Sequence, residues 1–226
     1  MQNYTYEFNG YNVTVIRPDN PNGQWIWKTE FLYAFDDAEK ELLNKGYTRV
    51  YYQISDMYGD YKAVRLMRKF YTHITEKFNL SKKCFLFGFS RGGLYAFNYA
   101  LSYPDTVEKI YLDAPVLDLK SWPPKDSIEQ RQMFERYSLN ETTLPIFNDN
   151  PVDNLKEFFD LKIPLLLVAG GSDEVVDFNR NSNKVIEYCR NNDIALEYYV
   201  KPDCKHHPHS LTDVSPIIKF ITDCPQ

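Results

Sequence analysis

One short stretch of the sequence combines residue types that could do chemistry. The apolar run 84–87 predicts a buried strand, and the run 94–100 predicts a helix that follows at once. Between them stands Gly88-x-Ser90-x-Gly92, the pattern of a serine on a sharp strand-to-helix turn. Glycines remove Cβ atoms that would collide there, and the helix N-terminus favours developing negative charge. The pattern therefore predicts a nucleophilic Ser90; the alternative is a glycine-rich turn with a surface serine.

A serine hydroxyl is a poor nucleophile at neutral pH, so Ser90 needs partners elsewhere in the chain. An imidazole titrates in the right range to take its proton, and a third group must fix the tautomer of that imidazole. Asp173 follows an apolar strand and two glycines, while His206 stands in the loop after the last predicted strand. The sequence thus predicts Ser90 as nucleophile, His206 as base and Asp173 as the orienting acid.

Both partner assignments leave alternatives open. Asp173 could instead cap the next helix, and Asp177, or less well Asp118, could replace it as the acid. His206 is preferred to its neighbour His207, which could pack inward or bind substrate.

Three of the four histidines are clustered at His206, His207 and His209, which raises the question of a metal site. No carboxylate or cysteine pair with ligand spacing accompanies them, and Pro208 breaks any helix that would align them. We therefore expect no metal and no cofactor.

Acyl transfer also needs backbone N–H groups to hold an oxyanion. The N–H of Arg91, the residue after the nucleophile, should supply one. The second should come from the loop predicted at 20–28, where Trp25 or Ile26 is the expected donor. The Arg91 side chain could pair with a substrate anion or with a structural carboxylate.

Aromatic residues near the expected mouth could form a wall for a sugar ring. The residues expected to bind substrate are Trp27, Tyr58 and Trp122, with His207 beside the base. For any single aromatic residue the alternative is packing in the core or under a cap.

The elements that must position these residues alternate between strands and helices. Strand signals occur at 4–8, 13–16, 49–54, 84–87, 108–112, 165–169 and 195–200. Helical patterns occur at 31–44, 61–78, 94–100, 127–137, 177–191 and 214–223. Asn9-Gly10 between the first two strands is a hairpin turn signal.

This alternation predicts an α/β fold, a doubly wound and mostly parallel sheet with an N-terminal β-hairpin. Residues 1–226 form one domain, and the stretch 116–161, which lacks the strand–helix rhythm, is expected to be a small cap insertion. Ligands of such sheets bind beyond the carboxyl ends of the strands, where Ser90, Asp173 and His206 all fall.

Composition excludes several classes of partner. The chain has 226 residues, a formal net charge of -5 and a pI of about 5.4, which argues against nucleic acid or an anionic membrane surface. The N-terminus shows no signal peptide, and no apolar run approaches a membrane span. Four scattered cysteines look like reduced thiols, so we expect a cytoplasmic protein: Cys84, Cys189, Cys204 and Cys224.

Four segments together resemble the α/β-hydrolase superfamily, in which the chain order is serine, acid, histidine. They are 88–94, 111–116, 121–123 and 201–211, and the resemblance covers nearly the whole chain. It is similar to a bacterial branch of carbohydrate esterases and prolyl-oligopeptidase-like hydrolases. That branch usually has glycine before its histidine pair, where this chain has Lys205.

The resemblance implies a serine esterase that cleaves a carboxylic ester through an acyl-enzyme. Its expected substrate is a small molecule or an oligosaccharide that carries an acetyl-type O-acyl group. Two alternatives remain, a serine peptidase of prolyl-oligopeptidase-like type and a non-catalytic hydrolase-fold binding module.

Overall fold

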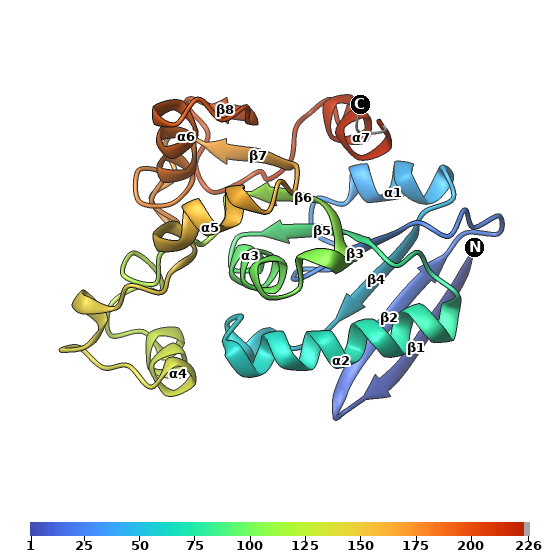
Figure 1. The fold of residues 1–226 in the computed structure, drawn as a ribbon, viewed down its shortest axis with the longest axis horizontal. Helices are drawn as coiled ribbons and strands as arrows, with labels where there is room; N and C mark the ends of the chain where they lie inside the picture. The colour runs from blue at the N-terminus through green and yellow to red at the C-terminus, as the bar shows by residue number, and fades with distance from the viewer. Residues whose placement is uncertain (224–226) are drawn as a thin grey trace.

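The computed structural model describes residues 1–223, which form one eight-stranded sheet with helices on both faces (Figure 1). The strands are β1 (Gln2–Phe8), β2 (Tyr11–Arg17), β3 (Trp25–Lys28), β4 (Thr48–Tyr52), β5 (Cys84–Phe89), β6 (Val107–Asp113), β7 (Leu165–Gly170) and β8 (Glu197–Lys201). The α-helices are α1 (Asp37–Asn44), α2 (Tyr61–Phe78), α3 (Gly92–Ser102), α4 (Ile128–Tyr137), α5 (Leu155–Asp160), α6 (Ser182–Asn191) and α7 (Ser215–Thr222).

The predicted N-terminal hairpin is confirmed. β1 pairs antiparallel with β2, and Asn9 and Gly10 between them have φ angles of 50° and 84°. A type I′ turn needs positive φ at both central residues, which is why asparagine and glycine stand there.

The sheet has the strand order β1-β2-β4-β3-β5-β6-β7-β8, and every pair from β4 to β8 is parallel. The predicted α/β fold with a mostly parallel sheet is therefore confirmed. Because parallel strands end at the same edge, the loops after β3, β5, β6, β7 and β8 all open on one side of the molecule.

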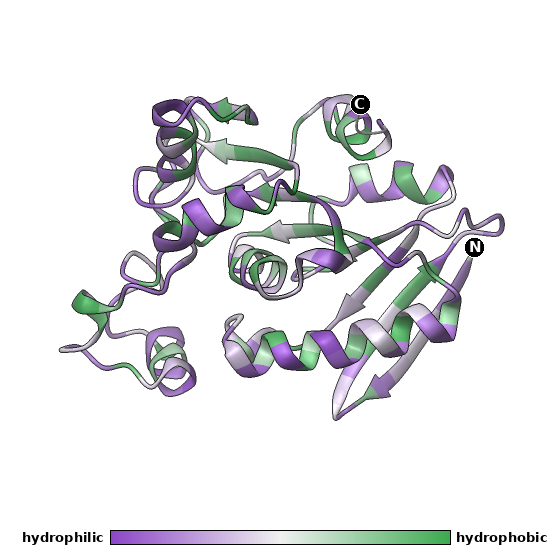
Figure 2. Ribbon diagram, viewed as in Figure 1, coloured by the Kyte–Doolittle hydropathy of each residue, from purple (hydrophilic) through white to green (hydrophobic). Residues whose placement is uncertain are grey.

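Two hydrophobic cores form the faces of the sheet, and β5 shows how one strand serves both. Cys84 and Leu86 pack into the core covered by α2 and α3, whereas Phe85 and Phe87 pack into the core covered by α1 and α7. Figure 2 shows the apolar colouring concentrated along the central strands and mixed along the helices. A strand buried on both faces has no polar alternation, as expected of a central parallel strand.

One correction concerns 25–28, which we expected to be a loop and which is the central strand β3. Its four residues are all buried, including Lys28, whose ammonium pairs with the equally buried Glu39. A four-residue strand that contains a paired lysine gives no recognisable strand pattern.

A second correction concerns the helix expected at 31–44, because only Asp37–Asn44 is α-helical. Phe31 and Phe35 have φ angles of 56° and 49°, which no right-handed helix accommodates. Residues 29–36 instead form an irregular loop at the carboxyl end of β3.

The segment 116–161, expected to be a cap, contains α4 and α5, which pack in different places. Met133 of α4 packs with Tyr58 and Trp122 in a third apolar cluster, and Figure 1 shows α4 set apart from the sheet. Phe158 of α5 instead stacks on Phe97 of α3, with ring centroids 4.4 Å apart, in the main core.

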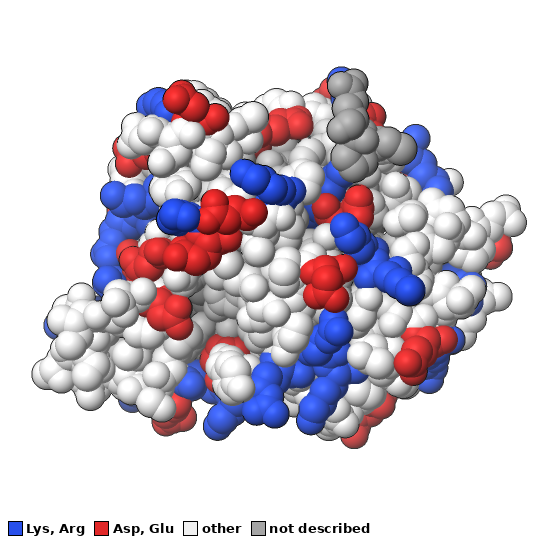
Figure 3. All heavy atoms as spheres, viewed as in Figure 1, with Lys and Arg blue, Asp and Glu red and all other residues white. Residues whose placement is uncertain are grey.

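Among residues 1–223 no helix is both long and apolar enough to cross a membrane. On the face drawn in Figure 3, basic and acidic side chains are interspersed. Cys84, Cys189 and Cys204 are free thiols, and Cys224 lies outside the described residues.

Candidate active site

Ser90 sits at a sharp turn between β5 and α3. Its φ angle is 49°, in the left-handed region that serine seldom occupies, so the backbone is strained there. Its N–H donates to the carbonyl oxygen of Asp113 at 2.9 Å, and its own carbonyl accepts the N–H of Val116 at 2.8 Å. The segment after β6 therefore holds the strained turn in place.

Gly93 is required for this turn because the chain after β6 passes close to it. A Cβ on Gly93 would lie 2.5 Å from Cβ of Pro115, well inside contact distance. The glycine thus permits the approach that lets the segment 113–116 bond to the backbone of Ser90.

The structure brings together the three side chains that the sequence singled out from distant parts of the chain. His206 Nε2 lies 3.0 Å from Ser90 Oγ, and His206 Nδ1 lies 2.7 Å from Asp173 Oδ2. Ser90 follows β5, Asp173 follows β7 and His206 follows β8, so the shared edge of the parallel strands explains their convergence. This hydrogen-bonded series can move a proton away from the serine hydroxyl.

The surroundings of Asp173 keep its carboxyl ionised. Its Oδ1 accepts the N–H groups of Val175 and Val176, each at 2.9 Å. Burial raises the pKa of the Asp173 carboxyl, but the hydrogen bonds from His206 and from these amides outweigh burial and hold the pKa below its usual value. A carboxylate facing Nδ1 places the proton of His206 on that atom and leaves the Nε2 lone pair facing Ser90.

A second buried aspartate–histidine pair lies beside the first, and sequence reasoning missed it. Asp113 Oδ1 is 2.7 Å from His209 Nδ1, while Asp113 Oδ2 accepts the Tyr111 hydroxyl at 2.6 Å and the Ser210 N–H at 2.7 Å. The ring centroids of His206 and His209 are 4.8 Å apart. The available signal was an aspartate at the carboxyl end of a strand next to the serine strand.

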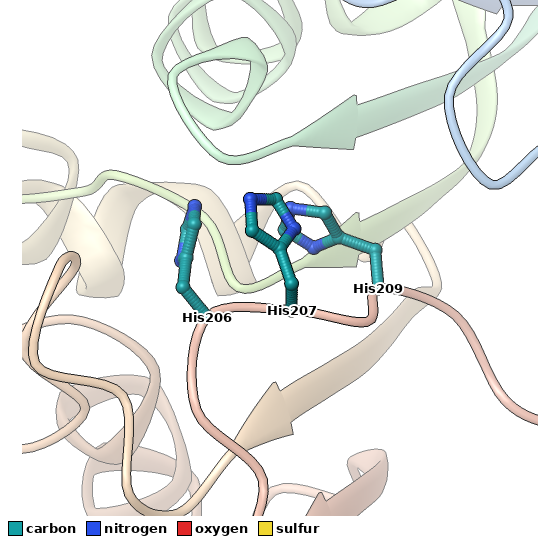
Figure 4. A group of neighbouring side chains, drawn as sticks. All are labelled: His206, His207 and His209. Atoms are coloured by element: carbon teal, nitrogen blue, oxygen red, sulfur yellow. The ribbon is translucent and has the colours of Figure 1, made fainter.

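The third histidine of the loop completes a triangle of imidazoles (Figure 4). His207 is exposed and stacks on Phe35 at a centroid distance of 5.6 Å. Its ring centroid lies 4.9 Å from those of His206 and His209. Burial and the nearby rings of His209 and His206 lower its pKa. As expected, no helix forms at Pro208, but the irregular loop itself brings the three rings together.

Trp25 and Ile26, expected to donate the second oxyanion N–H, are not near the serine. Ile26 pairs with Phe85, five residues before Ser90, which corresponds to about 16 Å along the strand. The loop at the carboxyl end of β3 starts instead at Thr29, whose hydroxyl donates to the Gly92 carbonyl at 2.8 Å.

The Arg91 side chain faces a structural carboxylate. Arg91 Nη2 lies 3.6 Å from Glu30 Oε2, which also accepts the Ser55 hydroxyl at 2.9 Å. Burial raises the pKa of the Glu30 carboxyl, and the guanidinium opposes that shift only in part. The Arg91 guanidinium also lies 5.8 Å from the centre of the Tyr58 ring, which is fully buried.

The aromatic residues expected to bind substrate are all buried, but they pack in different clusters. Trp27 is 1% exposed and packs between Trp25 and Phe70, so its expected role is wrong and it is a core residue. Tyr58 has no exposed surface, and its ring lies 6.0 Å from that of Trp122, which is 9% exposed.

Tyr58, which lies near Arg91, is also bonded to α4. Its hydroxyl donates to Gln132 Oε1 at 2.7 Å, and the Tyr137 hydroxyl donates to the Tyr58 carbonyl at 2.9 Å. Arg136 forms an ion pair with Asp60 at 2.7 Å beside a cavity of about 660 Å³. That cavity lies along α2, α3 and α4 and contains none of Ser90, Asp173 and His206 in its lining.

Comparison with solved structures shows the same fold in proteins named as peptidases and as a carboxylesterase. A puromycin-hydrolysing peptidase of Mycobacterium tuberculosis matches with a TM-score of 0.70 and 12% identity over 96% of this chain and 37% of its own. Dipeptidyl peptidase 4 of Porphyromonas gingivalis matches with a TM-score of 0.66 and 14% identity over 91% of this chain and 32% of its own. The chain therefore spans about a third of these two peptidases.

A carboxylesterase of Lactobacillus plantarum, Cest-2923, is closer in length. It matches with a TM-score of 0.66 and 16% identity over 92% of this chain and 85% of its own. A search of curated protein sequences finds no match.

The family model of the prolyl oligopeptidase family matches residues 44–224, which is well over half of the chain. This stretch contains the strained serine turn and the loops that carry Asp173 and His206. The chain belongs to the prolyl oligopeptidase family of serine hydrolases.

Proposed function

We propose that this protein hydrolyses a carboxylic acyl bond through an acyl-enzyme on Ser90. The observation that carries the proposal is the hydrogen-bonded series from Ser90 through His206 to Asp173 at 3.0 and 2.7 Å. A non-catalytic binding module would have no need to hold a serine in a strained turn with its hydroxyl against an oriented imidazole.

The proposed reaction has two halves. Ser90 Oγ bonds to the acyl carbon while its proton passes to His206 Nε2, which then gives that proton to the departing oxygen or nitrogen as its bond to carbon breaks. A water molecule next attacks the acyl-serine and loses its proton to His206. The Ser90–acyl bond breaks, the proton returns to Ser90 Oγ, and the acid leaves. Asp173 stays ionised and stabilises the imidazolium in both halves.

The oxyanion formed in each half needs two N–H donors, which we assign to the backbones of Arg91 and Glu30. Arg91 follows the nucleophile at the start of α3, where N–H groups point out of the helix. Thr29 N–H is used by the Phe87 carbonyl at 3.0 Å, so Glu30 has the first N–H of this loop beyond the sheet. A Cβ on Gly92 would lie 3.5 Å from Glu30 N, which places this N–H beside the turn.

For the leaving group, the family match favours an amine, as in a peptidase, over the carbohydrate ester that the sequence led us to expect. The structural neighbours named above include two peptidases, and none of the three has a name that mentions a carbohydrate. The saccharide part of our expectation therefore remains a prediction without support from these comparisons.

An ester substrate stays a second candidate because one of the structural neighbours is a carboxylesterase. This neighbour matches over 92% of this chain and 85% of its own, with a TM-score of 0.66.

The test compares wild type with Ser90→Ala on two activated substrates, p-nitrophenyl acetate and an aminoacyl p-nitroanilide. We expect the substitution to lower kcat on whichever substrate is cleaved by roughly 10⁴-fold or more, since the nucleophile acts as a unit with its base. Labelling by a fluorophosphonate probe should be lost in the same variant. Equal turnover by the two proteins would overturn the proposal, and the ratio of the two wild-type rates separates peptidase from esterase.

A further inference from the structure

The triangle of His206, His207 and His209 is arranged in a way that the proposed hydrolysis does not use. One ring nitrogen from each of the three lies within 4.8 Å of the other two. Figure 4 shows the three rings side by side on one short loop, turned toward a common space. His206 alone is needed for proton transfer, so the other two rings call for a different explanation.

The carboxylates behind two of these rings fix where their lone pairs point. His206 Nδ1 faces Asp173 and His209 Nδ1 faces Asp113, each at 2.7 Å and each buried. A ring whose Nδ1–H donates to a carboxylate keeps its Nε2 lone pair free, and metal-ligating histidines in proteins are oriented by this same carboxylate contact. The protein thus contains two such oriented imidazoles with ring centroids 4.8 Å apart.

We propose that His206, His207 and His209 bind a divalent transition-metal ion of the zinc type, and that this ion reversibly inhibits the hydrolase. Three imidazole nitrogens are a ligand set suited to zinc, and a water molecule or Ser90 Oγ would complete a tetrahedral site. Tetrahedral zinc places its nitrogens about 3.4 Å apart, so nitrogens that lie within 4.8 Å of one another must approach by up to about 1.4 Å. His207 can supply that movement because its side chain is exposed.

We expect inhibition because the metal would bind His206 Nε2, an atom that the proposed reaction needs. The lone pair of His206 Nε2 accepts the Ser90 proton in the proposed reaction, and a metal bound to that atom removes the acceptor. Only this inhibitory consequence rests on the proposed function, because metal binding depends on the geometry of the three rings alone.

The central variant is Asp113→Asn, which alters the side chain behind His209. Asp113 contacts Ser90 through its backbone carbonyl, which the substitution keeps. Asp113 Oδ2 accepts two donors, so the amide oxygen should take that place and the amide NH₂ should face His209 Nδ1. The His209 proton then moves to Nε2 and blocks the ligand position. Loss of such a supporting carboxylate typically weakens metal binding by 10–100-fold.

The experiment measures hydrolysis against free Zn²⁺ for wild type and Asp113→Asn, with each rate taken relative to the same protein in EDTA. We expect inhibition of wild type by Zn²⁺ and not by Mg²⁺, reversal by EDTA, and a 10–100-fold higher inhibitory Zn²⁺ concentration in the variant. His209→Phe, which keeps the ring shape against Phe89 and Phe35, should give the same shift if Asp113→Asn folds poorly.

Two further measurements keep the test decisive. Cys204 lies on the same loop, so Cys204→Ser is the control for a thiol site and should leave inhibition unchanged. Calorimetric Zn²⁺ titration of Ser90→Ala and of the Ser90→Ala/His209→Phe double variant reports binding even if no substrate is found. No Zn²⁺ binding by Ser90→Ala, equal binding by the two proteins, or inhibition that depends on Cys204 alone would overturn the proposal.

Discussion

Asp173–His206 and Asp113–His209 follow the same plan at the carboxyl ends of the neighbouring strands β7 and β6. In each pair one carboxylate oxygen accepts two donors from its own surroundings, and the other lies 2.7 Å from Nδ1 of the histidine. The difference lies on the far side of the ring. His206 Nε2 has the Ser90 hydroxyl at 3.0 Å, whereas no such hydroxyl contact is seen at His209 Nε2 within residues 1–223.

This difference shows that an oriented imidazole is not by itself a catalytic group. Both pairs are buried, a carboxylate orients each histidine, and the two histidines stand on one loop. The two histidines differ in what lies next to Nε2, because only His206 faces the strained serine that follows β5. The comparison can be tested by applying one chemical change to both aspartates.

The largest expected effect is on catalysis. In Asp173→Asn the amide oxygen should keep the two N–H bonds, so its NH₂ faces His206 Nδ1 and the ring proton moves to Nε2, where it cannot accept the Ser90 proton. We expect kcat/KM to fall by about 10³–10⁴-fold, the scale of a wrong tautomer. Asp113→Asn should cost less than about tenfold, because the same tautomer change at His209 meets no reacting group.

The measurement is kcat/KM of both variants on the better of the two activated substrates, in EDTA. Ser90→Ala provides the background rate. Similar losses of kcat/KM in the two variants would contradict this prediction and would indicate that His209 also takes part in proton transfer.

A smaller effect is expected on stability, and here the two pairs should behave alike. Each substitution replaces a charge-assisted hydrogen bond to a histidine with a neutral one while it keeps the other contacts. We expect each variant to lose about 1–3 kcal/mol in the free energy of unfolding. Urea unfolding at pH 7 measures this loss, with Asp203→Asn, an exposed carboxyl near the histidine loop, as the matched control. A variant as stable as wild type would show that its pair contributes nothing to folding.

The two pairs also differ in how far the sequence alone could reveal them. Ser90, Asp173 and His206 were found because a glycine-serine pattern is local and because its partners follow apolar strands in a known order. His209 and Asp113 are 96 positions apart, and no local pattern connects them. Their pairing depends on the register of β6 beside β5, which sequence periodicity does not determine.

The same limit explains the error at β3. Lys28 and Glu39 neutralise each other inside the fold, so a lysine that looks like a loop residue is the end of a buried strand. A contact between residues on different elements is needed before either charge can be placed inside. The misplacement of β3 then moved the expected oxyanion donor from the loop at Glu30 back to Trp25 and Ile26.

The smallest expected effect concerns the pH dependence of the Asp173 pair. Because the folded protein holds the pKa of Asp173 below its usual value of about 3.9, the ionised carboxylate stabilises the fold above that pH. This contribution is lost as the pH falls through the lowered pKa, where the folded carboxyl takes up its proton. The loss of stability in Asp173→Asn relative to wild type should therefore shrink as the pH falls below about pH 4.

Urea unfolding of wild type and Asp173→Asn between pH 7 and pH 3 measures this difference directly. Asp203→Asn, measured over the same range, corrects for the general loss of stability that acid causes. A difference that stays constant down to pH 3 would mean that the cost of Asp173→Asn comes from the shape of the amide group. A difference that grows below about pH 4 would contradict the lowered pKa, because the sign of the linkage requires the advantage of the carboxylate to disappear as the carboxyl takes up its proton.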